Sequence, residues 1–173
     1  MGSQAVQAKL WGRSPDDWSN IQEATGMAGY VYALDFLKLK EGTRLLDVGC
    51  GSGVFADMAY QTGANVTAVD ATAELIAEAK KRNASINFSV AEMEELSFEN
   101  DAFDVVCGFN SFQYAANVTN AFTEAKRVLK PGGRLVALIW GDKEDCEATS
   151  YLKTVGSLLP PPPPGEEDSR EER

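Results

Sequence analysis

The fold of this chain can be predicted from one segment, Leu45-Leu46-Asp47-Val48-Gly49-Cys50-Gly51-Ser52-Gly53. An apolar run is interrupted by an acid and then followed by glycines at alternate positions, which predicts a buried strand that ends in a tight turn. Residues from Val54 onward fit a helix, whose free N–H groups and positive dipole end point toward the turn. Because glycine has no Cβ, a ligand can approach the backbone of this turn closely. The segment therefore predicts a strand–turn–helix unit that binds a flat, partly anionic small molecule.

Strands and helices alternate on both sides of this unit. Apolar positions at helical spacing between Gly29 and Leu39 predict a helix that precedes it. Further patterns predict strands at 44–48, 65–70, 86–90, 103–107 and 134–140, and helices at 54–61, 72–82 and 118–129. This alternation is typical of a Rossmann-like, doubly wound α/β fold with a mainly parallel sheet and helices on both faces. We expect the ligand beyond the carboxyl ends of the strands, with strand 44–48 at the point where the strand order reverses.

Composition limits the classes of partner. The chain has 173 residues, a net charge of -10 and 44% hydrophobic residues, which is typical of one globular domain. Because surfaces that bind nucleic acids are basic, this charge argues against a nucleic-acid partner. No apolar stretch is long enough to span a bilayer, and the start of the chain has no signal-peptide pattern. We therefore expect no membrane span and a cytoplasmic location, which the few scattered cysteines also favour.

The chain contains no histidine. This absence removes the commonest metal ligand, the usual general base, and any Ser-His or Cys-His nucleophile pair. Cys50, Cys107 and Cys146 are too few and too scattered for a zinc cluster. The sequence thus predicts no metal site, and it singles out no catalytic residue.

A second acid favours a ligand that contains a ribose. Asp70 ends the second predicted strand, 19 residues after Gly51, and a carboxylate there can accept hydrogen bonds from both ribose hydroxyls. Taken alone, an aspartate at a strand end more often caps a helix, and a glycine turn can be a plain strand-to-helix connection. The two features together favour the ribose role. Gly49, Gly51 and Gly53 form GxGxG, whereas dinucleotide-binding proteins have GxGxxG.

These features resemble the class I S-adenosylmethionine-dependent methyltransferases of the small-molecule type, which includes ubiquinone and menaquinone biosynthesis enzymes. The segment 45–53 resembles the first motif of that family, and Asp70 resembles its ribose-binding acid. Three further segments resemble the stretch after the third strand, the fourth strand, and the turn into the fifth strand, namely 91–98, 103–106 and 127–133.

The resemblance implies S-adenosyl-L-methionine as the cofactor and S-adenosyl-L-homocysteine as the product formed from it. The implied cofactor-binding residues lie in the glycine turn and after the second, third and fourth strands: Asp47, Gly49, Cys50, Gly51, Gly53, Asp70, Ala71, Glu92, Met93 and Phe109. The Glu92 carboxylate would bind the adenine amino group, at a place where the family normally has Asp. The backbone N–H of Met93 would meet the adenine ring.

The resemblance also implies residues that face a small-molecule acceptor. They lie in the N-terminal part and after the fourth strand: Trp18, Tyr30, Asn110, Phe112, Gln113 and Tyr114. Trp11 joins Trp18 and Tyr30 as a candidate for a lid over the site. Packing in the core or at the surface stays an open alternative for the aromatic residues. The protein's task would be to hold the acceptor in line with the methyl–sulfur bond of the cofactor.

The predicted domain organisation departs from the family near the C-terminus. We predict an N-terminal helical lid at 1–40, a Rossmann-like core at 41–142, one helix at 143–159 and a Pro-rich, charged, disordered tail at 160–173. The family's sheet ends in an antiparallel hairpin, but nothing after Asp142 resembles two strands. The fifth strand would then be an exposed apolar edge, which predicts a homodimer that forms through this edge.

Three functions stay open at the level of the sequence. The first is in-line methyl transfer to a small-molecule acceptor. The second is a truncated domain that binds the cofactor without catalysing a reaction. The third is an NAD(P)-binding reductase, which the GxGxG spacing disfavours.

Overall fold

The computed structural model describes residues 2–141 and 154–155. Met1–Ile139 forms one compact unit, which contains every helix and strand named below, and Trp140–Arg173 forms a second. The helix predicted at 143–159 falls outside the described residues except for Thr154 and Val155, which are helical. The tail predicted at 160–173 lies wholly outside them.

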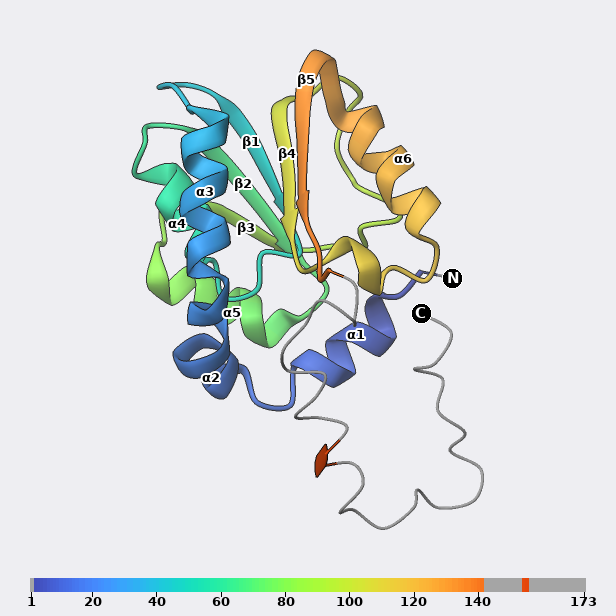
Figure 1. The fold of residues 1–173 in the computed structure, drawn as a ribbon. Coiled ribbons are helices and arrows are strands. Elements are labelled where there is room, and N and C mark those ends of the chain that lie inside the picture. The colour runs from blue at the N-terminus through green and yellow to red at the C-terminus, as the bar shows by residue number, and fades with distance from the viewer. Residues whose placement is uncertain (1, 142–153, 156–173) are drawn as a thin grey trace. The chain divides into compact units, whose positions relative to one another are not determined.

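A five-stranded parallel sheet forms the centre of Met1–Ile139 (Figure 1). The strands are β1 (Arg44–Val48), β2 (Asn65–Asp70), β3 (Asn87–Val90), β4 (Phe103–Phe109) and β5 (Leu129–Leu138). Their spatial order is β3-β2-β1-β4-β5, so the order reverses at β1. This confirms the predicted Rossmann-like α/β fold and the predicted switch-point strand.

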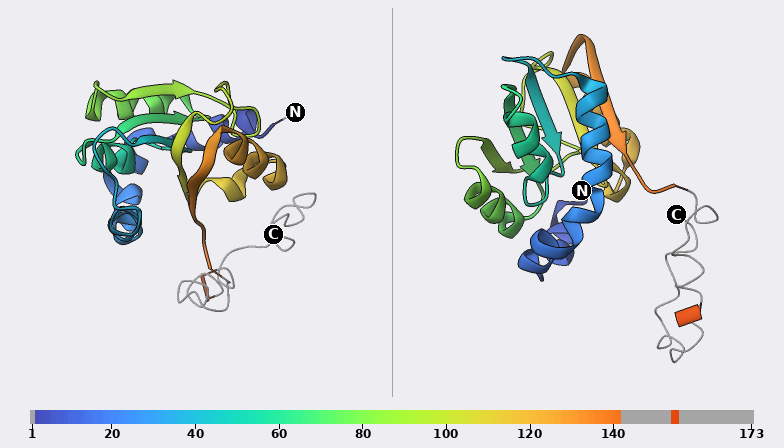
Figure 2. Two further views of the ribbon diagram at one scale, coloured as in Figure 1. Left: turned by 90° about the horizontal axis from the view of Figure 1, so that it is seen from above. Right: turned by 60° about the vertical axis from the view of Figure 1, so that its left-hand side comes forward.

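Helices cover both faces of the sheet (Figure 2). One face is covered by α3 (Met27–Leu37), α4 (Val54–Tyr60) and α5 (Ala73–Arg82), and the other by α6 (Val118–Val128). Leu45 and Leu46 are both fully buried, but Leu45 belongs to the core beneath α3–α5 and Leu46 to the core beneath α6. Because successive side chains of a strand point to opposite faces, one short strand anchors both cores.

The chain before α3 is built from short helical pieces. They are α1 (Gln4–Trp11), α2 (Pro15–Asp17), the π-helical turn η1 (Trp18–Gln22) and the 3-10 turn η2 (Glu23–Gly26). We call Gln4–Gly26 the N-terminal segment. In Figure 1 its helices α1 and α2 lie beyond the ends of the strands toward which the arrows point, which are the carboxyl ends. This places the segment where the site is expected, and its role as a lid stays a prediction.

The boundaries of three strands differ from the sequence prediction: β3 begins one residue later than predicted, β5 ends at Leu138 and not at residue 140, and β4 and β5 differ further. β4 extends to Phe109 because its ladder with β5 continues to the pair Phe109 and Leu138. β5 begins at Leu129, which pairs with Phe103, and not after the Pro-Gly-Gly turn. The register shifts between Phe103 and Val105, so residues 130–133 form an irregularity inside the strand and not a turn before it.

β5 is an edge strand of the sheet that the structure describes. Its side chains include the exposed Leu135 and Leu138. An exposed apolar edge is a surface on which another strand can pair, and the predicted pairing with a second copy stays a prediction.

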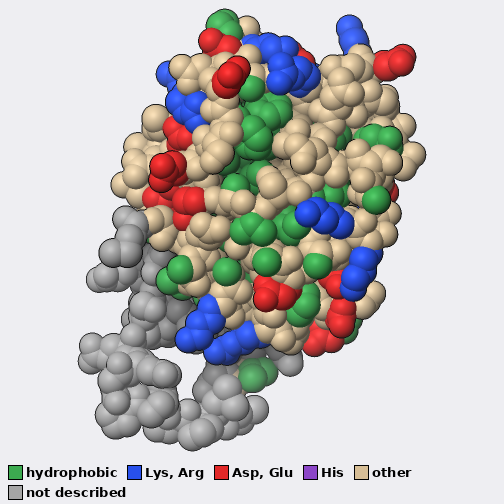
Figure 3. Space-filling view, turned by 180° about the vertical axis from the view of Figure 1, so that it is seen from behind, with side chains coloured by type: hydrophobic (Ala, Val, Ile, Leu, Met, Phe, Trp, Pro, Cys, Tyr) green, Lys and Arg blue, Asp and Glu red, His purple; other side chains and the backbone are tan. Residues whose placement is uncertain are grey.

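The face drawn in Figure 3 carries acidic and basic side chains interspersed among hydrophobic and polar ones. This face therefore has no continuous basic surface of the kind that binds a phosphate backbone. None of the helices within the described ranges is long and apolar enough to cross a membrane.

The turn between β1 and α4 depends on Gly49. Its φ is +77°, a backbone conformation that side-chain-bearing residues rarely adopt. A Cβ at this position would lie 2.3 Å from Cβ of Ser111. The Ser111 hydroxyl donates a 2.7 Å hydrogen bond to the Val48 carbonyl and is buried, so it has little freedom to move away. The close approach of the β1–α4 turn to the residues after β4 therefore requires glycine at 49.

We predict that Gly49→Ala lowers the free energy of unfolding more than Gly42→Ala does. Both glycines have a positive φ, +77° and +80°, so both alanines carry a similar backbone strain of about 1–2 kcal/mol. Only alanine at 49 also meets Ser111, because no described atom lies within 4 Å of a Cβ at 42. This overpacking adds about 1–3 kcal/mol. Urea denaturation followed by circular dichroism measures the difference, and equal losses in the two variants would contradict it.

Candidate functional site

One pocket lies between the carboxyl ends of the strands and the N-terminal segment. Its lining includes seven of the predicted cofactor residues: Gly49, Cys50, Gly51, Asp70, Ala71, Met93 and Phe109. It also includes four of the predicted acceptor residues: Trp18, Tyr30, Asn110 and Tyr114. Strands β1, β2 and β4 are neighbours in a parallel sheet, so the residues at their carboxyl ends meet at the same edge.

Asp70 is held in one orientation at the end of β2. Its Oδ2 accepts a 2.9 Å hydrogen bond from the Gly51 N–H, and its Oδ1 accepts a 2.8 Å bond from the Thr72 N–H. Burial raises the pKa of Asp70, while these backbone hydrogen bonds lower it, and the net shift is upward. Both bonds come from backbone groups, one in the glycine turn and one just after β2, so they fix the direction in which the carboxylate points. The side chain is therefore a preoriented acceptor that borders the pocket.

Asp47 lies outside the lining of the pocket, on β1 just before the glycine turn, and is only 1% exposed. The Cys107 thiol donates to its Oδ1 at 3.8 Å, while its Oδ2 has no hydrogen-bond partner among the described residues. Burial raises the pKa of Asp47 to about 8; the Cys107 bond opposes the shift, and the charges of Glu23 and Asp70 add to it. A cation near this carboxyl would stabilise its charged form.

Glu23 lines the pocket although no sequence signal pointed to it. It is 4% exposed, and its carboxylate accepts hydrogen bonds from the Ser52 hydroxyl and, at 3.4 Å, from the Val54 N–H. Arg82 Nη2 lies 3.7 Å from its Oε2. Burial raises the pKa of Glu23 in spite of these partners. The contacts join residues 29 and 31 positions apart, which no local pattern reveals.

Glu92 lies outside the lining, next to Met93, which belongs to it. Its Oε2 accepts a 2.7 Å hydrogen bond from the Gln4 N–H, and its Oε1 accepts a 3.1 Å bond from the Glu94 N–H. The start of α1 therefore contacts the carboxylate that the resemblance assigns to the adenine amino group.

Aromatic rings form much of the wall of the pocket. Trp11 makes edge-to-face contacts with Trp18 and Tyr114, at 4.8 and 5.5 Å between ring centroids, and Tyr30 meets Phe109 at 5.2 Å. Burial raises the pKa of Tyr30, and the charges of Glu23 and Asp47 raise it further. The Tyr30 phenol thus stays protonated at neutral pH, so it can donate a hydrogen bond but cannot act as a base.

Besides Asp47 and Glu92, three further predicted site residues lie outside the lining. Phe112 is 1% exposed and stacks on Phe122 in the core beneath α6, at 4.7 Å between centroids. Gln113 donates a hydrogen bond to Asn110 Oδ1 and is not part of the lining. Gly53 precedes α4, with Phe88 and Ala79 beside its backbone. Residues 112–114 form one 3-10 turn, in which successive side chains point in different directions.

Sequence reasoning also missed part of the lining. Gln7 and Ser111 carry no pattern of their own, and their place depends on how the N-terminal segment and the β4–α6 connection pack. Leu75 also lines the pocket. The sequence could have indicated this, because Leu75 lies near the start of α5, little more than one helical turn after Asp70. Trp11, named as a lid candidate, lines the pocket as well.

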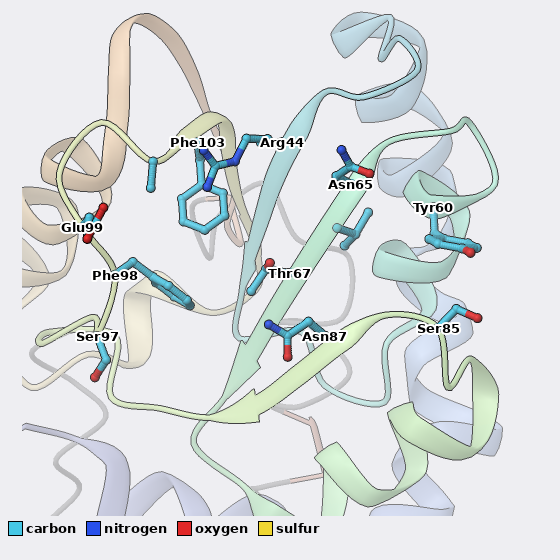
Figure 4. Close-up of a pocket in the computed structure, with 12 residues that line it drawn as sticks. Arg44, Tyr60, Asn65, Thr67, Ser85, Asn87, Ser97, Phe98, Glu99 and Phe103 are labelled. Carbon is cyan, nitrogen blue, oxygen red and sulfur yellow. The ribbon is translucent and has the colours of Figure 1, made fainter.

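A second pocket opens at the amino ends of the strands, away from the glycine turn (Figure 4). Its lining includes Arg44, Phe103, Thr67 and Asn87, and the Arg44 guanidinium lies 5.7 Å from the centre of the Phe103 ring. Because open parallel sheets bind ligands at the carboxyl ends of their strands, we place the candidate site at the first pocket.

We predict that Asp47→Asn removes a pH-dependent loss of stability. The folded-state pKa of about 8 lies above the ordinary value of 3.8, so the folded chain binds more protons than the unfolded chain between these values. The contribution of Asp47 is fully present below the ordinary pKa and is lost as the pH rises through the folded pKa. Urea denaturation between about pH 5 and 9 should show a steeper fall for the natural chain than for the variant. An equal pH dependence of the free energy of unfolding in the two chains would contradict the raised pKa of Asp47.

The sequence of this chain is similar to those of known proteins. Residues 46–137 match the family described as "Methyltransferase domain". The chain is 27% identical over 136 residues to a malonyl-[acyl-carrier protein] O-methyltransferase of Erwinia billingiae, covering 79% of this chain and 53% of that protein. It is 33% identical over 99 residues to a ubiquinone biosynthesis O-methyltransferase of Xanthomonas oryzae, covering 54% and 41%. The chain thus spans about half the length of these relatives, or less.

Solved structures show the same fold. A chain in the complex of the Haloferax volcanii Trm112 methyltransferase activator has a TM-score of 0.67 and 25% identity, over 81% of this chain and 66% of that one. A protein of Methanococcus maripaludis has a TM-score of 0.67 at 18% identity, over 88% and 74%, and shows the fold alone. Since the family match spans more than half of the residues, this chain belongs to the methyltransferase-domain family, of the class I S-adenosylmethionine-dependent type.

Proposed function

We propose that this chain binds S-adenosyl-L-methionine in the pocket at the carboxyl ends of β1, β2 and β4 and transfers its methyl group to a small-molecule acceptor. The observation that carries the proposal is Asp70, whose carboxylate is fixed beside the glycine turn by the N–H groups of Gly51 and Thr72. An acid held in this way is suited to accept both hydroxyls of a ribose.

The remaining lining fits the other parts of the cofactor. Leu75 and Met93 offer apolar surface to a purine ring beside Asp70. The glycine turn leaves room for the amino-acid end. The charged residues among the described lining are the acids Glu23 and Asp70, and Asp47 lies just before the turn. A ligand with a sulfonium and an ammonium group supplies the positive charge that these acids lack.

The bound cofactor supplies a methyl group that is already activated for transfer. The chain's own residues bind and orient the reactants. Tyr30, Phe109 and Tyr114 line the pocket with aromatic rings near the end of β4. Asn110 and Tyr114 carry polar groups that can orient an acceptor for in-line attack. Neither the inactive domain nor the reductase gains support from a specific observation.

We predict that Asp70→Asn weakens binding of S-adenosyl-L-methionine by about 100-fold, since hydrogen bonds from ribose hydroxyls to a charged acceptor are lost. Isothermal titration calorimetry measures the affinity. The matched control is Asp104→Asn, which removes a half-buried carboxylate at the amino end of β4 that pairs with Lys130 and accepts from the Arg44 N–H, and it should leave the affinity unchanged. Undiminished affinity in the Asp70 variant, or binding of NAD by the natural chain in place of the sulfonium ligand, would refute the proposal.

We further predict that binding of the cationic cofactor releases protons below about pH 8. A nearby cation lowers the raised pKa of Asp47, so its carboxyl loses a proton on binding and the affinity rises between about pH 6 and 7.5. Titrations in buffers of different ionisation enthalpy measure the released protons. Asp47→Asn should lower the number released, and an unchanged number would rule out this coupling.

A further inference from the structure

We propose that the N-terminal segment recognises the amino-acid end of the cofactor, with the Glu23 carboxylate binding its ammonium group and the Trp18 indole N–H binding its carboxylate. The inference rests on the proposed function, because it concerns the same pocket and the same ligand. Two residues outside the Rossmann-like core would then recognise a ligand group that lies over the glycine turn.

The first step is the position of Glu23. Within Gln4–Gly26 it is the one buried residue, while its neighbours Gln22 and Ala24 are exposed. Its carboxylate reaches the glycine turn, where the Ser52 hydroxyl and the Val54 N–H donate to it. The N-terminal segment therefore brings an acidic side chain into contact with the turn over which the cofactor's amino-acid end is proposed to lie.

The second step is the incomplete compensation of this charge. Among the ion pairs of the described residues, Arg82 is the cation that meets Glu23, and its Nη2 lies 3.7 Å from Oε2, beyond hydrogen-bond distance. Its guanidinium donates instead to the carbonyl and the hydroxyl of Ser52, at 3.0 and 3.2 Å. Burying a carboxylate without a closely bonded cation is unfavourable, and an ammonium group in the pocket would offset that cost.

The third step is an unused donor beside Glu23. Trp18 Nε1 is buried and has no hydrogen-bond partner within the part of the chain that the structure describes. It lies 3.1 Å from the place where a Cβ on Gly51 would stand, so it sits directly over the glycine turn. Buried N–H groups are rarely left without an acceptor, and a ligand carboxylate over the turn would provide one.

The two groups match a zwitterion. Trp18 Nε1 and Glu23 Oε1 lie 3.1 and 3.5 Å from the place where a Cβ on Gly51 would stand, so the donor and the acceptor approach the same part of the glycine turn. An α-amino acid carries an ammonium and a carboxylate on one carbon, which is the pair that this acceptor and this donor require. Because both side chains belong to the N-terminal segment, binding of that end would also hold the segment closed over the pocket.

The test compares two ligands that differ in the amino-acid end. S-adenosyl-L-homocysteine carries it, and 5′-methylthioadenosine lacks it. We expect Glu23→Gln and Trp18→Phe each to weaken binding of S-adenosyl-L-homocysteine by about 10- to 100-fold and to change binding of 5′-methylthioadenosine less than about two-fold, as measured by calorimetry. The control Asp17→Asn removes an exposed acid of the same segment and should change neither affinity.

Each outcome decides between a recognition role and a packing role. Equal weakening of both ligands would show that Glu23 and Trp18 only hold the segment in place, and an unchanged affinity for S-adenosyl-L-homocysteine would also overturn the inference. If the natural chain binds neither ligand, the proposed function itself fails. A natural chain that binds 5′-methylthioadenosine as tightly as S-adenosyl-L-homocysteine keeps the proposed function and refutes this inference.

Limited proteolysis of the natural chain gives a second measurement that needs no variant. Arg13 is an exposed trypsin site between α1 and α2. We expect S-adenosyl-L-homocysteine to slow cleavage after Arg13 and 5′-methylthioadenosine to slow it much less, because only the first ligand holds the segment closed. Equal protection by the two ligands at saturation would contradict the inference.

Discussion

The hydrogen bond from the Gly51 N–H to the Asp70 carboxylate, 2.9 Å long, is the constraint on which the site depends. It ties the turn after β1 to the end of β2, two points that adjacent parallel strands bring to one edge of the sheet. The bond orients the ribose acid that we propose. Gly49 fixes the other side of the turn, because it packs against Ser111 from the β4–α6 connection. These contacts hold together the turn after β1, the end of β2 and the residues after β4.

Three buried acids determine the electrostatics around the glycine turn. Glu23, Asp47 and Asp70 surround the turn, and burial raises the pKa of all three. Such an arrangement costs stability in the empty protein and becomes favourable when a cation enters, which is a common compromise between stability and function. Among the described residues, Arg82 forms an ion pair with Glu23, in which its Nη2 lies 3.7 Å from Oε2. These acids therefore favour a ligand that carries positive charge, as the proposed cofactor does.

The N-terminal segment contributes side chains to the lining of the pocket. It contributes Gln7, Trp11, Trp18 and Glu23 to a pocket whose remaining lining comes from the Rossmann-like core and from Tyr30 on α3. Its attachments to the core include polar contacts: the Gln4 N–H bonds to Glu92, the Gln7 amide to the Tyr114 carbonyl, and the Ser52 hydroxyl to Glu23. The Trp11 ring also meets the Tyr114 ring.

The strand–turn–helix unit, the sheet topology at β1 and the place of Asp70 could be predicted from the sequence, because each follows from local periodicity, glycine spacing and the handedness of parallel connections. It could not determine where Glu23 lies, or that Phe112 enters the core while Tyr114 faces the pocket. Nor did it predict the contact of Glu92 with Gln4, which lie 88 positions apart. These features depend on packing between distant segments, and only the tertiary structure decides which face of a short helical turn is buried.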